Sequence, residues 1–157
     1  MPTPDFILEL RKYVGHAPLW LSGVTAVVFN EAGELLLAQR AETGRWGLVS
    51  GILEPGEQPA QAVLREIREE TGVEARVERL SSFWAGDPMV IFSNGDQVQF
   101  LDLTFRCAYV SGDARAADDE NTAVAWFAAD ALPVLKDTHQ RRLEHARARE
   151  GSPYFVV

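Results

Sequence analysis

The spacing of apolar residues predicts three helices in this chain. Apolar side chains within residues 5–14 recur three and four positions apart, which predicts a short amphipathic helix that ends near Gly15. Residues 59–71 show the same spacing, with a proline suited to the first turn and Gly72 suited to the left-handed position that closes a helix. The polar segment 136–150 predicts a C-terminal helix with few apolar contacts.

Strand patterns fill most of the remaining chain. Residues 23–29 and 34–39 flank a turn sequence that contains Gly33, which predicts a β-hairpin. Further strands are predicted over residues 73–84, 97–110 and 124–127, and the first two of these are separated by the turn signals Asp87-Pro88 and Asn94-Gly95.

Alternation within segment 97–110 shows how this strand is expected to pack. Asp102, Thr104 and Arg106 alternate with apolar residues, so one face of the strand is expected to be buried. Strands that alternate with one strong central helix predict an α/β fold in which a mixed sheet packs between helices. At 157 residues, the chain is expected to form a single domain over residues 1–157.

Composition and charge narrow the class of protein. The chain is 46% hydrophobic and 24% charged, as expected for a soluble globular protein, and its longest apolar run, near residues 24–29, is too short to span a bilayer. The first residues mix acids and bases with apolar positions, which disfavours a secretion signal, and Cys107 alone cannot form an internal disulfide. We therefore expect a cytoplasmic protein. The net charge of −8 disfavours binding to long nucleic acid but is compatible with a small phosphate-containing ligand.

The central helix carries an unusual concentration of acidic residues. Glu66, Glu69 and Glu70 lie three and four positions apart on one face, where like charges destabilise a helix by roughly 0.2–0.5 kcal/mol per pair. Arg65 and Arg68 compensate part of this charge. Because carboxylate oxygens are the ligands that hard divalent cations prefer, the pattern indicates a site for Mg²⁺, with Mn²⁺ as a substitute.

The spacing of these residues resembles a known motif. Gly51, five residues, Glu57, seven residues and then the sequence REIREETGV match every fixed position of the Nudix box, G-x5-E-x7-R-E-U-x-E-E-x-G-U, in which U is a bulky aliphatic residue. The chain thus resembles the Nudix hydrolases, or MutT-like proteins, with its box at residues 51–73. The resemblance implies an α/β/α sandwich with a mixed β-sheet between helices. One departure is Val49-Ser50-Gly51, where relatives usually carry Pro-Gly-Gly, which makes the loop less permissive and is expected to alter the substrate fit.

The resemblance also assigns roles to individual residues. It implies metal binding by the backbone carbonyl of Ser50 and by the side chains of Glu57, Glu66, Glu69 and Glu70. Arg65 is expected to hold Glu66 and Glu69 in place. Relatives supply another carboxylate from a loop beyond the sheet, and within Asp118-Asp119-Glu120 our choice is Glu120, although these residues also fit a solvated turn. Glu66, Glu69 and the Glu120 loop all remain candidates for the general base.

Several residues outside the box are weaker candidates for binding the nucleotide. Arg40 and Arg45 flank the approach to the box and could contact a phosphate, although arginines at strand ends are more often solvated. Trp84, with Phe83 and Trp20, could stack on a nucleobase, although aromatic residues in strands more often belong to the core. The histidines show no spacing suited to zinc.

These features predict a Mg²⁺-dependent hydrolase that cleaves a phosphoanhydride of a nucleoside diphosphate linked to a second moiety, by attack of water on phosphorus. ADP-ribose or a nucleotide sugar is the favoured substrate, and a nucleoside triphosphate, in a MutT-type housecleaning role, is the alternative. A non-catalytic nucleotide-sensing module is a hypothesis of another class, which the intact box glutamates disfavour. Removal of mRNA caps is disfavoured by the acidic charge. Relatives that act on ADP-ribose are often dimers, so a homodimer is a further expectation.

Overall fold

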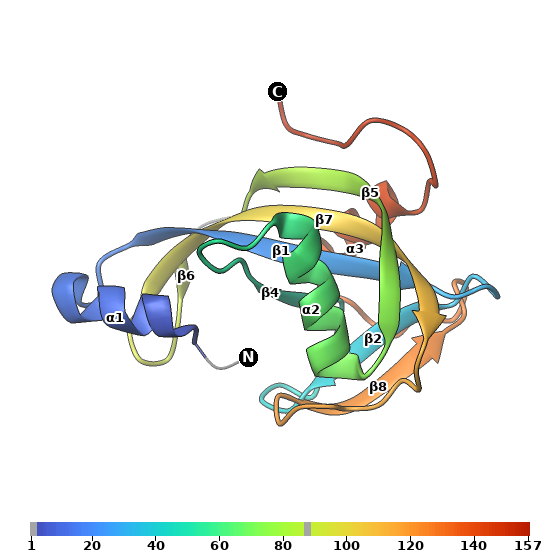
Figure 1. Ribbon diagram of the computed structural model, residues 1–157, viewed down its shortest axis with the longest axis horizontal. Helices are drawn as coiled ribbons and strands as arrows, with labels where there is room; N and C mark the ends of the chain where they lie inside the picture. Colours follow the sequence, from blue (N-terminus) through green and yellow to red (C-terminus); the bar gives the residue numbers. More distant parts are fainter. Residues whose placement is uncertain (1–2, 87–88) are drawn as a thin grey trace.

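The computed structural model describes residues 3–86 and 89–157 and shows one mixed sheet flanked by helices (Figure 1). The helices and strands in chain order are α1 (Asp5–Val14), β1 (Leu19–Phe29), β2 (Leu35–Arg40), β3 (Trp46–Gly47), β4 (Val49–Ile52), α2 (Pro59–Thr71), β5 (Glu74–Ala85), β6 (Val90–Ile91), β7 (Gln97–Ser111), β8 (Asn121–Phe127) and α3 (Asp137–Ala146).

The long strands β1 and β7 form the centre of the sheet. They run parallel in continuous register from Leu19 opposite Val98 to Phe29 opposite Ala108. Antiparallel partners surround this pair: β5 and β6 pair with β7, β4 and β2 pair with β1, and β8 and β3 pair with β2. The predicted mixed sheet is therefore confirmed.

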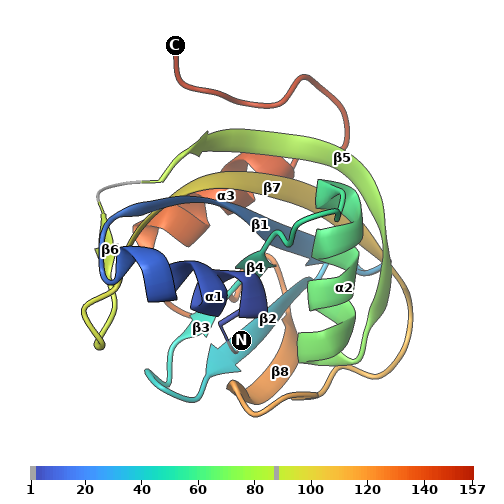
Figure 2. The ribbon, with the colours of Figure 1, turned by 60° about the vertical axis from the view of Figure 1, so that its left-hand side comes forward.

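Alternating side chains of β1 reach opposite faces of the sheet. Val24, Ala26 and Val28 belong to the apolar cluster that includes buried residues of α2, whereas Val27 belongs to the cluster beneath α3. Figure 1 accordingly shows α2 in front of the sheet and α3 behind it. The two helices bury both faces, which confirms the predicted sandwich. Figure 2 shows α1 beside the end of the sheet where β1 begins, where Ile7 packs against Leu21 and Val98.

Helix α2 has the predicted bounds because both of its ends carry strong local signals. Pro59 occupies the first turn, and Gln58 and Gln61 form a reciprocal capping box. At the other end Gly72 adopts φ 70°, and its N–H donates to the carbonyl of Arg68. The box glutamates are thereby fixed on a helix of defined register.

The predicted hairpin was only partly correct. The turn at Gly33 forms, but β1 and β2 pair at Phe29 and Leu35 alone within the described part of the chain. Strand β1 continues along β4, and β2 runs beside β8. The sequence signal was local, whereas the more extensive pairings, of β1 with β4 and of β2 with β8, join segments that are farther apart in the chain. The short strands β3 and β4 were not predicted.

Other elements also differ in extent from the predictions. Helix α3 ends at Ala146 and does not reach Glu150. Strand β7 is buried on both faces, because α3 covers Asp102, Thr104 and Arg106, so its polar face is not solvated. The Asn94-Gly95 turn joins β6 to β7, with Gly95 at φ 89°. The Asp87-Pro88 signal lies outside the described residues.

No helix within residues 3–86 and 89–157 is both long and apolar enough to cross a membrane.

Candidate active site

Arg65 gathers three of the predicted carboxylates of the Nudix box into one cluster. Its guanidinium donates from Nε and Nη2 to the two oxygens of Glu57, at 2.8 and 3.0 Å. Nη1 donates to Glu66 Oε1 at 2.8 Å and to Glu69 Oε2 at 3.2 Å. A single arginine at the start of the acidic face thus fixes the approach loop to the helix.

Arg40 gathers the remaining two carboxylates into a second cluster. Its Nη1 lies 3.2 Å from Glu70 Oε2 and 3.6 Å from Glu120 Oε2, and its Nη2 lies 3.5 Å from the hydroxyl of Ser50. The register between β2 and β8 shifts between Gln39 and Arg40, as at a β-bulge. Such an irregularity redirects a side chain near an active site, and here it ends the regular ladder at the arginine.

The two central glutamates are buried to an extent unusual for carboxylates. Glu66 and Glu70 are each 1% exposed. Burial raises the pKa of Glu66 to about 7 against the opposing effect of Arg65, and burial likewise raises the pKa of Glu70 against that of Arg40. By contrast, the hydrogen bond from Arg65 lowers the pKa of Glu57. A further positive charge beside Glu66 and Glu70 would stabilise their ionised forms and lower both pKa values.

The backbone leaves room for the Glu66 side chain only because residue 51 is glycine. A Cβ at position 51 would overlap the carboxyl group of Glu66, so any side chain there would displace the glutamate. Glu70 is held on one side by the amide of Asn121, which donates to Oε2 at 3.1 Å and to Asp118 Oδ1 at 3.1 Å. The other oxygen, Oε1, is buried without a hydrogen-bond partner in the described protein.

This donor set fits a hard divalent cation. Its atoms are carboxylate oxygens from one helix face and the adjoining loops, and the orphaned Oε1 of Glu70 can act as an acceptor. Among the residues that the structure describes, no three acidic, histidine or cysteine side chains converge as a ready metal cage. The reason is visible in the contacts, because Arg65 and Arg40 hold the carboxylates in two separate groups.

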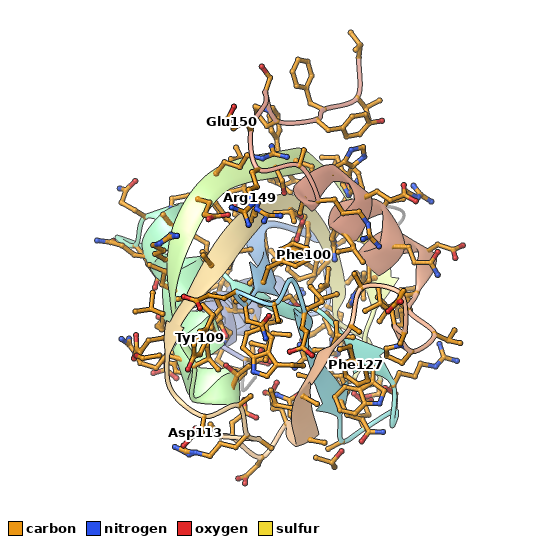
Figure 3. All side chains as sticks on the ribbon, turned by 90° about the vertical axis from the view of Figure 1, so that its right-hand side faces the viewer. Phe100, Tyr109, Asp113, Phe127, Arg149 and Glu150 are labelled. Carbon is orange, nitrogen blue, oxygen red and sulfur yellow. The ribbon has the colours of Figure 1, made fainter. Side chains whose placement is uncertain are left out.

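A cleft of about 760 Å³ adjoins the Arg40 cluster. Ser50, Gly51, Arg40 and Glu120 line one part of it, and Phe100 belongs to the same lining. In Figure 3, Phe100 lies near the centre of the view, beneath the arch formed by β5 and β7. The cleft therefore extends from the acidic cluster across the sheet face that α3 covers.

The sequence did not reveal a second polar group in this cleft. Asp102 accepts hydrogen bonds from Thr25 at 2.8 Å and from Thr104 at 2.7 Å, and Arg142 Nε lies 3.2 Å away. Asp102 and Arg142 both line the cleft, as does Lys136. An aspartate within an otherwise strand-like segment, two residues before Thr104 on the same face, was the available signal, but the other partners lie on β1 and α3 and could not be identified from spacing.

Two predicted ligand contacts are not brought to this cleft. The described lining includes Arg40 but not Arg45, whose side chain is exposed. Trp84 lies against His145 and Tyr154 and lines a separate pocket of about 120 Å³. His139 supports the backbone: its Nδ1 accepts the N–H of Leu48, and burial lowers its pKa to about 4.

Comparison with known proteins finds relatives of this chain by sequence and by structure. The NUDIX domain profile matches residues 20–148. A MutT-like protein of Streptomyces ambofaciens is 36% identical over 113 residues, which cover 72% of this chain and 67% of that protein. The NAD-capped RNA hydrolase NudC of Pseudomonas aeruginosa is 36% identical over 118 residues, which cover 73% of this chain but only 39% of that protein. A solved UDP-X diphosphatase superposes with a TM-score of 0.65 at 26% identity, covering 90% of this chain and 68% of that one.

This chain belongs to the Nudix family, and the relatives compared above include proteins named as a hydrolase and a diphosphatase.

Proposed function

We propose that the protein is a Mg²⁺-dependent hydrolase that cleaves the phosphoanhydride of a nucleoside diphosphate linked to a second moiety. The observation that carries this proposal is the pair of buried glutamates, Glu66 and Glu70, of which Glu70 has an oxygen without a hydrogen-bond partner in the described structure, beside a cleft of about 760 Å³. Burying carboxylates is costly unless a cation compensates them, so the arrangement suits a bound metal.

The residues divide the work as follows. Glu66 and Glu70 would hold the cation, with Glu57, Glu69 and the carbonyl of Ser50 as further ligands or as groups that orient water. Bound Mg²⁺ would supply positive charge to the phosphoryl oxygens and lower the pKa of water. Arg65 keeps Glu57, Glu66 and Glu69 in register through the contacts described above. Glu120, which lines the cleft, would accept a proton from the attacking water, with Glu66 and Glu69 as the other candidates for this role.

The favoured substrates are ADP-ribose and nucleotide sugars. Support comes from the size of the cleft, which extends well beyond the acidic cluster and so leaves space for groups on both sides of a diphosphate. The solved relative named UDP-X diphosphatase acts, by its name, on a substrate of this kind. Nucleoside triphosphates are the second candidate, since the Streptomyces relative is named MutT-like. The net charge of −8 argues against the long RNA substrate in the name of NudC.

A substrate panel tests the proposal. The purified protein is incubated with Mg²⁺ and, separately, with ADP-ribose, UDP-glucose, a dinucleotide and nucleoside triphosphates, and products are separated by chromatography. We expect nucleoside monophosphate from one of the diphosphate-linked compounds, and no product after Mg²⁺ is removed with a chelator. Nucleotide binding without product across the panel would instead favour a sensing module.

A further inference from the structure

Arg40 contacts carboxylates that the proposed metal ion would also use. Its Nη1 lies between two carboxylates, 3.2 Å from Glu70 and 3.6 Å from Glu120, which come from α2 and from the loop before β8. Glu70 is buried, so its charge has little access to solvent. Among the described residues, Arg40 is the cation whose attraction most strongly opposes the rise in the pKa of Glu70.

We propose that Arg40 is an exchangeable counterion: it neutralises Glu70 and Glu120 while the metal is absent and leaves them for the substrate diphosphate when a divalent cation binds. This inference rests on the proposed function, because it requires Glu70 to be a metal ligand. A guanidinium at Glu70 Oε2 and a divalent cation at the unpartnered Oε1 of the same buried carboxylate would repel each other. Arg65, beside Glu66, is anchored by both oxygens of Glu57, whereas Arg40 can move away. Arg40 therefore competes with the metal before the reaction and assists the substrate during it.

The surroundings of Arg40 allow such a movement. Its side chain is 27% exposed and lines the cleft, so the guanidinium can turn toward a ligand without crossing the protein core. Its contact with the Ser50 hydroxyl, at 3.5 Å, is too long to hold it firmly. An arginine can also bind two oxygens of a diphosphate at once. The carboxylates release the arginine readily only when another cation takes its place.

The separation of the carboxylates supports the same conclusion. Glu66 and Glu70 lie one turn apart on α2, yet Glu66 is bound to Arg65 and Glu70 to Arg40. Arg65 also binds Glu57 through both oxygens, which makes it a fixed part of the loop. Arg40 has no comparable two-pronged contact in the described structure, so it is the arginine of the two that can be exchanged.

The test is the affinity of Arg40→Gln for Mn²⁺ without nucleotide, measured from the free Mn²⁺ signal in electron paramagnetic resonance. The measurement is made at pH 8.5, above the pKa of Glu66, so that protons compete little with the metal. We expect Mn²⁺ to bind about tenfold more tightly than to the wild type, while KM for the best substrate rises about tenfold. A merely structural arginine would not change these two constants in opposite directions.

Arg45→Gln is the matched control, because it removes one positive charge from the turn between β2 and β3, close to Arg40 in the chain but exposed and outside the described cleft lining. Its Mn²⁺ affinity should stay within about twofold of the wild type. Unchanged or weaker Mn²⁺ binding by Arg40→Gln would overturn the inference. A wild-type protein that neither binds Mn²⁺ nor releases product would overturn the proposed function instead.

A measurement on the wild type makes the test independent of how the variant folds. The Nε–H resonance of Arg40 is followed by nuclear magnetic resonance, with assignment from Arg40→Lys. Saturating Mg²⁺ should shift this resonance and speed its exchange with water, and subsequent addition of a non-hydrolysable diphosphate should slow the exchange again. A resonance that does not respond to Mg²⁺ would show that Arg40 stays on Glu70 and would contradict the proposal.

Discussion

The protein buries carboxylates on both faces of its sheet and treats them differently. On the α3 face, Asp102 receives hydrogen bonds at both oxygens, from Thr25 and Thr104, and an ion pair from Arg142. On the α2 face, Glu70 keeps an oxygen that is buried without a hydrogen-bond partner in the described structure. Both groups are almost inaccessible to solvent, so exposure alone does not distinguish them.

The two sites differ in which groups compensate the negative charge of the buried carboxylates. Around Asp102 the protein supplies two hydroxyls and the charge of a guanidinium, so both oxygens of the carboxylate have partners, although Arg142 Nε is itself buried without a hydrogen-bond partner in the described structure. Around Glu66 and Glu70 the protein supplies too little, and burial raises the pKa of both. Incomplete compensation of a buried group marks a functional site more clearly than burial or charge does.

The largest expected effect comes from Glu70→Gln. The change removes a charge from the acidic cluster while it keeps the volume of the side chain and the amide can still contact Asn121. We expect turnover at saturating Mg²⁺ to fall by at least about a hundredfold, because a metal ligand is lost. The free energy of unfolding without metal should not fall. Turnover close to the wild-type rate would remove Glu70 from the proposed ligand set.

Asp102→Asn makes the same chemical change on the other face and should give the opposite pattern. It leaves Arg142 without its carboxylate beneath α3, and breaking a buried ion pair in this way costs about 3 kcal/mol. Urea denaturation measures this loss, and the Mn²⁺ affinity should remain near that of the wild type. If Asp102→Asn were as stable as Glu70→Gln, the two faces would not differ in the way described.

The pH dependence of stability provides a third comparison, through Glu66. Its pKa rises from 4.5 in the unfolded chain to about 7 in the folded protein, so between these values the folded protein binds more protons. Its contribution to the free energy of unfolding therefore falls as the pH rises from about 4.5 to about 7 and is constant above that range, with a total loss of about 3 kcal/mol. Thermal melting without metal, at pH 5 and pH 8, measures the change.

Glu66→Gln is the control for that measurement, because an amide does not titrate. The variant should lose this part of the pH dependence, and its metal-free form should melt at a higher temperature than the wild type at pH 8. Added Mg²⁺ should stabilise the wild type more at pH 8 than at pH 5, since the ligands are then ionised. An identical pH profile for the two proteins would contradict the assigned cause.

The sequence revealed the acidic cluster because its information is local. The glutamates and Arg65 lie within one short segment, and a capped helix sets their register, so spacing alone places them on one face. The Arg40 cluster was less visible, because a β-bulge and a loop 80 residues further along the chain bring Arg40 to Glu120. The Asp102 group was missed, since it depends on the parallel pairing of β1 with β7 and on the position of α3.

Ser50→Gly is expected to have the smallest effect, and it tests how much the departure from Pro-Gly-Gly matters. Ser50 lies opposite Thr25 in the ladder between β4 and β1, and its hydroxyl touches Arg40 only at 3.5 Å. Removing the side chain should lower stability by about 0.5–1 kcal/mol, because glycine loses more freedom on folding. It leaves every carboxylate in place, so kcat should change by less than about threefold, with a larger shift in KM as Arg40 loses a neighbour. Steady-state kinetics on the best substrate measures both constants, and a change in kcat as large as that of Glu70→Gln would show that the loop, and not the incomplete compensation of the glutamates, governs the site.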